Sequence, residues 1–129
     1  MKIDIFNHVF PKGFFDRYIA SGAAGKEIGK RMANARVGFD LDLRFRVLDE
    51  FGDVRQVITL GQPPIEALGG PAESPAIARE ANDGLAELVA KHPDRFIAFA
   101  ASLPLNNAEA SLEEMRRAID HLGAKCVMV

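Results

Sequence analysis

The residues best suited to chemistry lie close to the start of the chain, in the run Ile3-Asp4-Ile5-Phe6-Asn7-His8. Alternate side chains of a β-strand share a face, so a short strand that ends in His-x-His places two imidazoles together. Neutral imidazole is the commonest transition-metal ligand in proteins. Here His8 occupies the second histidine position, but Phe6 occupies the first and has no lone pair to donate. The segment therefore predicts a metal site with one ligand missing.

Three neighbours of His8 have alternative interpretations. Asp4 alternates with Phe6 and His8, so we expect it on the same inward face of the strand. There it would support a ligand of the metal or hydrogen-bond to the neighbouring strand. Phe6 and Asn7 are candidates for lining a substrate pocket, and the alternative is that they pack in the interior of the domain.

The remaining histidines and the cysteine favour structural roles. His92 precedes a proline at the end of a predicted helix, and His121 lies in the last turn before Gly123, so both suit contacts with a helix C-terminus. The three histidines do not form a metal triad by spacing. Cys126 is the only cysteine, which excludes an internal disulfide and fits a reducing cytoplasm. Its apolar strand predicts a buried, inert thiol.

The arginines and one loop leave several possibilities open. The usual interpretation is a solvated helix face or a helix-terminus contact, and it applies to Arg44, Arg46, Arg95, Arg116 and Arg117. One arginine from the region 31–46 could instead bind a substrate carboxylate through its planar guanidinium. The loop from Gly61 to Gly70 follows a predicted strand and serves as a lid, as a pocket lining or as a plain connector.

Strand-like runs alternate with helical patterns and would position these residues. We expect strands at residues 2–9, 54–60, 96–103 and 125–129. Helical patterns lie around residues 14–19, from 40 to 51, from Ser74 to His92 and from Asn106 or Asn107 to Leu122, while residues 21–25 weaken the first of them. Ser74 suits an N-cap, and Gly52 and Gly123 suit helix ends. This order predicts an α/β fold with a parallel sheet and right-handed crossovers.

Composition limits the function classes. The chain has 129 residues, which suits one domain over residues 1–129. Its net charge is −2 and its isoelectric point about 5.9, so binding to nucleic acid or to an anionic membrane is not expected. The apolar runs are too short for a transmembrane helix, and no signal peptide is evident. We expect a cytoplasmic protein.

Several segments together resemble the amidohydrolase-related metal-dependent decarboxylases, the group typified by aminocarboxymuconate-semialdehyde decarboxylase. The resemblance covers most of the chain and is weakest between Gly13 and Phe39. It begins with Met1-Lys2-Ile3-Asp4-Ile5 and His8-Val9-Phe10-Pro11, and continues with Asn82-Asp83-Gly84-Leu85-Ala86 and His92-Pro93-Asp94-Arg95-Phe96. It ends with Leu103-Pro104-Leu105, Glu113 to Ala118 and Leu122-Gly123-Ala124-Lys125.

This resemblance implies a TIM barrel, which typically needs about 250 residues, so the sequence matches the first four strands of a partial barrel. Family members are generally Zn²⁺-dependent and decarboxylate or hydrate small unsaturated or aromatic acids. By resemblance, His8 is one ligand of Zn²⁺ or another divalent metal, and Phe6 stands where a second histidine would be. The substrate would be a small carboxylic acid, with Phe6 and Asn7 beside it.

Three functions remain open from the sequence. The first is a metal-dependent decarboxylase or hydrolase of this family. The second is a catalytically inactive, truncated half-barrel that self-associates, because an apolar fourth strand at 125–129 leaves an unprotected edge; either way a homo-oligomer is expected. The third is a flavodoxin-like domain that binds a phosphorylated ligand at its strand ends. The third ranks last because no glycine-rich phosphate loop joins a strand to a helix.

Overall fold

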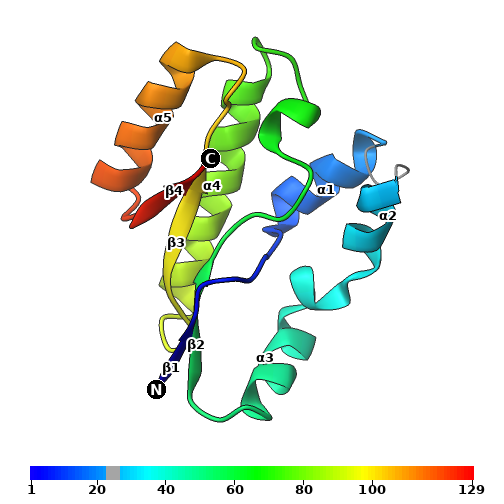
Figure 1. The fold of residues 1–129 in the computed structure, drawn as a ribbon, viewed down its shortest axis with the longest axis vertical. Helices are drawn as coiled ribbons and strands as arrows, with labels where there is room; N and C mark the ends of the chain where they lie inside the picture. The colour runs from blue at the N-terminus through cyan, green and yellow to red at the C-terminus, as the bar shows by residue number, and fades with distance from the viewer. Residues whose placement is uncertain (23–26) are drawn as a thin grey trace.

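The computed structural model describes residues 1–22 and 27–129 and contains a four-stranded parallel sheet. The strands are β1 (Lys2–Asp4), β2 (Val54–Ile58), β3 (Phe96–Ser102) and β4 (Cys126–Met128). They lie in the order β1-β2-β3-β4, with Ile3 opposite Arg55, Val57 opposite Ala98 and Ala101 opposite Val127. Consecutive parallel neighbours joined by helices are the arrangement of half a (β/α)8 barrel, which confirms the predicted fold class (Figure 1).

Helices connect each strand to the next. The first crossover holds α1 (Lys12–Ala20), α2 (Glu27–Asn34), the short 3-10 helix η2 (Arg36–Gly38) and α3 (Leu41–Asp49). The second holds η3 (Ile65–Ala67) and the long α4 (Ser74–Lys91), and the third holds α5 (Ala108–Asp120). Among the described residues, none of these helices combines the length and the apolar character needed to cross a membrane. The expected weakening of the first helix at residues 23–25 lies outside the described residues.

Local sequence signals explain most of the helix boundaries. Asp40 accepts a hydrogen bond from the backbone of Leu43 at 3.0 Å and caps α3, and Asn107 caps α5 in the same way. Gly52 and Gly123 have φ angles of 79° and 78°, a left-handed conformation that glycine adopts without strain. The predicted N-cap of α4 was wrong by one position, because Ser74 is already helical and its hydroxyl bonds Asn106 instead.

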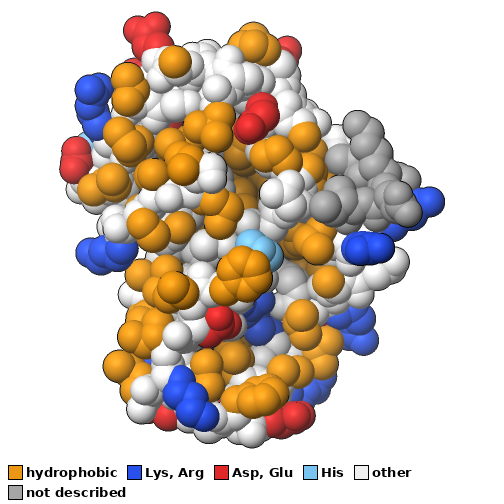
Figure 2. All heavy atoms as spheres, in the orientation of Figure 1, with side chains coloured by type: hydrophobic (Ala, Val, Ile, Leu, Met, Phe, Trp, Pro, Cys, Tyr) orange, Lys and Arg blue, Asp and Glu red, His pale blue; other side chains and the backbone are white. Residues whose placement is uncertain are grey.

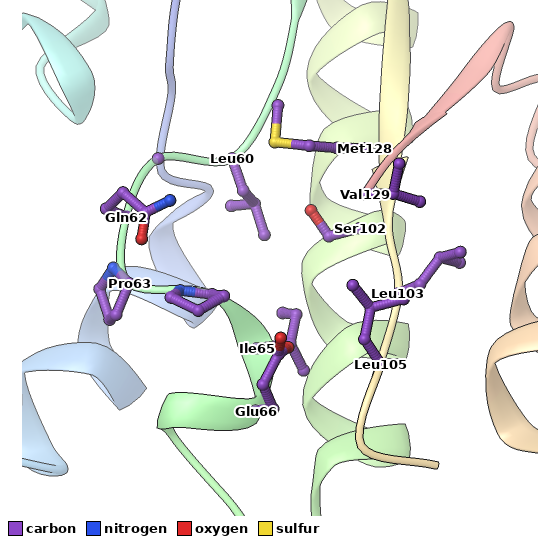
Figure 3. A pocket seen from close by; sticks show the side chains of 12 residues that line it. Leu60, Gln62, Pro63, Ile65, Glu66, Ser102, Leu103, Leu105, Met128 and Val129 are labelled. Atoms are coloured by element: carbon purple, nitrogen blue, oxygen red, sulfur yellow. The ribbon is translucent and has the colours of Figure 1, made fainter. Parts of the chain in front are cut away.

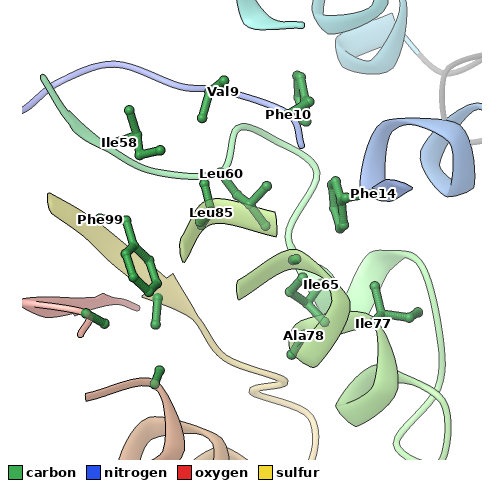
Figure 4. Close-up of a cluster of buried hydrophobic side chains, with 14 of the residues drawn as sticks. Val9, Phe10, Phe14, Ile58, Leu60, Ile65, Ile77, Ala78, Leu85 and Phe99 are labelled. Carbon is green, nitrogen blue, oxygen red and sulfur yellow. The ribbon is translucent and has the colours of Figure 1, made fainter. Parts of the chain in front are cut away.

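The hydrophobic core lies between the sheet and the helices. One buried cluster contains Ile58 of β2, Phe99 of β3, Ile77 and Leu85 of α4, and Phe14 of α1 (Figure 4). All five side chains are at most 3% exposed. Complete burial of a large apolar side chain contributes about 1.5–3 kcal/mol, so this cluster is what holds the helices on the sheet.

The opposite face of the sheet is open and apolar. Figure 2 shows hydrophobic side chains gathered over the strands on this side. A groove of 640 Å³ runs across the face and is lined by Ile5, Val57, Ala100 and Met128, among others. Cys126 also lines it and is exposed, so the prediction of a buried thiol was wrong. An apolar strand predicts burial on both faces, whereas no described residue covers this face of β4.

Candidate functional site

The first strand is shorter than predicted, and this changes where its polar side chains lie. β1 ends at Asp4, whose Oδ1 accepts a hydrogen bond from the backbone N–H of Phe6 at 3.0 Å. That turn breaks the alternation of a strand. The expected common inward face for Asp4, Phe6 and His8 was therefore wrong. Asp4 turns toward β2 and accepts a hydrogen bond from Gln56 Nε2 at 2.7 Å, as one of its two predicted roles required.

His8 lies beyond β1, at the end of the sheet where the strands have their carboxyl termini. Its Nδ1 is 2.9 Å from the hydroxyl oxygen of Thr59, which follows β2. The ring of Phe6 meets the His8 imidazole edge to face, with 5.9 Å between the ring centres. Phe6 is 88% exposed and contributes nothing to the core. The structure thus places an imidazole and an exposed aromatic ring side by side.

The sequence did not predict the residue that organises this segment, Arg44 of α3, which is only 5% exposed. Its Nη1 donates to the carbonyl oxygens of His8 and Val37 at 2.8 and 3.0 Å. Its Nη2 donates to Asn7 Oδ1 at 2.7 Å, and its Nε donates to Gln56 Oε1 at 2.7 Å. Arg44 therefore ties the segment after β1 to β2 and to η2.

The charge of Arg44 is buried among neutral acceptors. Burial lowers the pKa of its guanidinium to about 10, and the nearby Asp4 carboxylate partly offsets this shift. Arg44 consequently stays charged at neutral pH, yet its donors are directed into the protein. The expectation of a solvated arginine was wrong for Arg44. The spacing from Leu41 to Arg44 and Leu48 already places Arg44 on the apolar stripe of α3, and this was the available signal.

Asn7 belongs to the same network. Its Nδ2 donates to the carbonyl oxygens of Asp4 and Val57 at 3.1 and 3.0 Å, and its Oδ1 accepts from Arg44. The side-chain amide of Asn7 is thus engaged by the protein itself. Its predicted part in substrate binding stays a prediction.

The loop after β2 lines a cavity of 170 Å³ at the carboxyl ends of the strands (Figure 3). Gln62, Pro63 and Glu66 come from this loop, and Ser102 and Met128 come from the ends of β3 and β4. Of the roles considered for the loop from Gly61 to Gly70, lining a pocket is the one this geometry supports. In barrels of this kind the active site forms at this end of the strands.

The other histidines lie at helix ends, as predicted. His92 is the C-cap of α4, where its ring lies 5.0 Å from that of Phe45, and His121 is the C-cap of α5. Within residues 1–22 and 27–129, no three His, Cys, Asp or Glu side chains gather closely enough to hold a metal ion. These residues do not provide a complete metal site, and the predicted role of His8 as a ligand stays a prediction.

The segment Asn82-Asp83-Gly84, which carries part of the family resemblance, holds α4 against its neighbours. Asn82 is fully buried and exchanges two hydrogen bonds of 2.9 Å with the backbone of Ser102. Its Nδ2 also donates to Glu114 Oε1 of α5 at 2.8 Å. Gly84 has room for no side chain, because a Cβ there would lie 2.4 Å from Cβ of Pro11.

Arg117 of α5 completes this second polar network. It binds both carboxylate oxygens of Glu114 at 2.9 Å and donates to Asp83 at 2.8 Å. The hydrogen bonds to Glu114 raise the pKa of Arg117 above its usual range. A solvated role for Arg117 was therefore wrong, since its guanidinium joins α5 to α4.

Comparison with known proteins agrees with this geometry. Gamma-resorcylate decarboxylase of Rhizobium sp. (strain MTP-10005) is 43% identical over 82 residues, which cover 64% of this chain and 25% of that protein. The 2-amino-3-carboxymuconate-6-semialdehyde decarboxylase of Dictyostelium discoideum is 26% identical and matches all of this chain but 40% of its own length. The chain thus spans well under half the length of these relatives.

A solved structure shows the same arrangement of strands and helices. The dihydroxybenzoic acid decarboxylase of Polaromonas sp. JS666, determined with bound manganese and the inhibitor 2-nitroresorcinol, superposes with a TM-score of 0.79 at 29% identity. The superposition covers 99% of this chain and 37% of that one. The family model described as Amidohydrolase matches residues 3–129. The resemblance seen in the sequence is confirmed, and the chain belongs to the amidohydrolase family.

Proposed function

We propose that this chain provides the first four strands of a decarboxylase that acts on a small aromatic carboxylic acid. The observation that carries the proposal is the placement of His8 beside an exposed aromatic ring at the carboxyl end of β1, in a chain whose relatives are named as decarboxylases. A structurally similar protein, 2,6-dihydroxybenzoate decarboxylase, was solved with 2,6-dihydroxybenzoate bound.

A divalent metal is part of this proposal, with His8 as one ligand. A relative holds manganese, so Zn²⁺ and Mn²⁺ are both candidates. A bound divalent ion stabilises negative charge that develops on oxygen atoms of a substrate. Because the described residues supply no complete ligand set, the other ligands would have to come from elsewhere.

The residues of this chain would orient the substrate and keep water away from it. Phe6 exposes its ring beside His8, where an aromatic acid could stack. Asn7 acts indirectly, because its amide fixes the segment that carries both residues. The cavity between the β2 loop and the ends of β3 and β4 has walls formed largely by Leu60, Ile65, Leu103 and Met128, which favour an apolar ring over water.

The exposed face of the sheet favours a second candidate, an inactive half-barrel that self-associates. Ile3, Ile5 and Val129 are 51%, 73% and 91% exposed, and they belong to or adjoin the two edge strands. Contiguous exposed apolar surface usually marks an interface. This candidate needs no substrate, and it predicts an oligomer in which one copy covers this face of another.

A turnover assay separates the two candidates. We expect the whole protein in which this chain forms the first four strands, purified and supplied with Mn²⁺ or Zn²⁺, to decarboxylate 2,6-dihydroxybenzoate, with loss of substrate followed by chromatography. His8→Ala should lower the rate at least about 100-fold, which corresponds to about 2.7 kcal/mol of transition-state stabilisation. His121→Ala, a matched change at an exposed helix end, should leave the rate unchanged.

If neither metal supports turnover above background, the decarboxylase proposal fails. Sedimentation then tests the alternative, which requires an oligomer. A strictly monomeric species would refute self-association.

A further inference from the structure

The hydroxyl of Thr59 lies between two partners from the segment after β1. Its oxygen is 2.7 Å from the backbone carbonyl oxygen of Asn7 and 2.9 Å from Nδ1 of His8. A threonine hydroxyl has one hydrogen to donate and two lone pairs that can accept. The two contacts are therefore not interchangeable, and they determine where the ring proton of His8 lies.

Counting protons gives a single consistent arrangement. A carbonyl oxygen only accepts, so the 2.7 Å contact with Asn7 requires the hydroxyl hydrogen of Thr59. That hydrogen is then unavailable to His8, and the remaining 2.9 Å contact must use a proton on Nδ1. The opposite tautomer would direct two lone pairs at each other across either the Asn7 contact or the His8 contact. Neutral His8 must therefore carry its proton on Nδ1.

The surrounding backbone holds this arrangement in place. The carbonyl oxygen of His8 accepts from the buried Arg44 at 2.8 Å. The next backbone N–H, that of Val9, donates to the carbonyl oxygen of Thr59 at 2.9 Å. These two bonds hold the backbone of His8 and the backbone of Thr59 in place. The imidazole of His8 and the hydroxyl of Thr59 therefore keep a fixed relative position.

We propose that Thr59 is a positioning residue that holds His8 as the Nδ1–H tautomer and leaves the Nε2 lone pair free for a divalent cation. No described residue hydrogen-bonds Nε2. A ligand histidine normally donates its other ring N–H to an acceptor that fixes its tautomer, and here the hydroxyl of Thr59 would be that acceptor. The use of Nε2 by a metal rests on the proposed function, whereas the position of the proton does not.

Nitrogen NMR of the imidazole ring tests the proposal without any metal. At about pH 8, where histidine is ordinarily neutral, ring ¹⁵N shifts and their couplings to the carbon-bound protons distinguish a protonated nitrogen from one with a lone pair. We expect Nδ1 of His8 to be the protonated nitrogen in the metal-free protein. His92 and His121 serve as internal references in the same spectra. If the proton of His8 is found on Nε2, the proposal is overturned, whatever the enzymatic activity.

Two variants test the role of the hydroxyl. Thr59→Ser keeps the hydroxyl as donor and acceptor, so His8 in this variant should remain the Nδ1–H tautomer. Thr59→Val has nearly the same shape but no hydroxyl, so a large share of His8 should move to the Nε2–H tautomer. An unchanged tautomer in Thr59→Val would show that Thr59 does not hold it. Because the wild-type measurement stands alone, a variant that fails to fold does not remove the test.

Addition of Zn²⁺ alone then probes the freed nitrogen. We expect the Nε2 resonance of His8 to shift or broaden. Nδ1 of His8 should remain protonated. Zinc-induced loss of the Nδ1 proton would contradict the proposed orientation. If decarboxylation is absent but the Nδ1–H tautomer is present, the proposed function fails and this inference survives.

Discussion

Replacement of Arg44 by methionine should destabilise the protein more than any other single change near the candidate site. Arg44→Met keeps a long apolar side chain but removes four hydrogen bonds, to the carbonyls of His8 and Val37 and to the side chains of Asn7 and Gln56. Each buried acceptor left without a partner costs about 1–3 kcal/mol. A cleft of 270 Å³ beside Arg44 admits water to some of them. The expected loss is therefore about 3–5 kcal/mol in the free energy of unfolding.

Urea denaturation followed by far-ultraviolet circular dichroism measures this loss. Arg46→Met is the matched control, because Arg46 lies two positions along α3 and is exposed. It should change the unfolding free energy by less than about 0.5 kcal/mol. Arg44→Lys keeps the charge but cannot reproduce the planar set of donors. Its loss of unfolding free energy should therefore lie between those of Arg44→Met and Arg46→Met. If the free energy of unfolding of Arg44→Met lies within about 1 kcal/mol of the wild-type value, which is about the contribution of one ordinary hydrogen bond, the network does not stabilise the segment.

Three further changes probe other parts of the fold. Glu114→Gln should cost about 2–4 kcal/mol because it leaves the partly buried donors of Arg117 facing a neutral amide, whereas Glu113→Gln on the exposed side of α5 should cost almost nothing in the same denaturation assay. Gly84→Ala should lower stability by about 1–3 kcal/mol through the clash with Pro11, and combining it with Pro11→Gly should recover part of the loss; additive effects would argue against the contact. Asp40→Asn should flatten the acid limb of the stability curve. The hydrogen bond from the backbone of Leu43, followed by that from Arg36, lowers the pKa of Asp40, so its contribution is present above the ordinary value of 3.8 and is lost as pH falls below it. An identical acid limb in the variant would contradict this assignment.

The elements that follow from local rules were predictable, and the elements that depend on distant partners were not. Asn107 and Asp40 are recognisable caps because their partners lie three residues away. The early end of β1 depends on one side-chain bond from Asp4 to the backbone of Phe6, which an apolar run does not reveal. Thr59 gained its role only through partners 51 and 52 positions away. No periodicity in the sequence encodes such contacts.

The candidate site shows the same division. His8 was predicted to be a ligand from its residue type and its place at the end of a predicted strand, and this role stays a prediction. The spacing from Leu41 to Leu48 indicates the inward direction of Arg44, but its four acceptors come from separate segments and cannot be read from the sequence. The exposure of Cys126 required knowing what lies against each face of β4, and composition alone does not supply that.

The close fit of Gly84 against Pro11 has a consequence for how the ancestry of such chains is recognised. Two segments that carry the family resemblance, His8-Val9-Phe10-Pro11 and Asn82-Asp83-Gly84, meet at this point, and their contact is steric. Asn82, two residues away, likewise bonds the backbone of Ser102. These parts of the signature describe how a helix is mounted on its sheet. A descendant that had lost all catalysis would retain these residues for as long as it still had to fold. Relatedness inferred from them therefore indicates a shared fold, and the activity has to be measured separately.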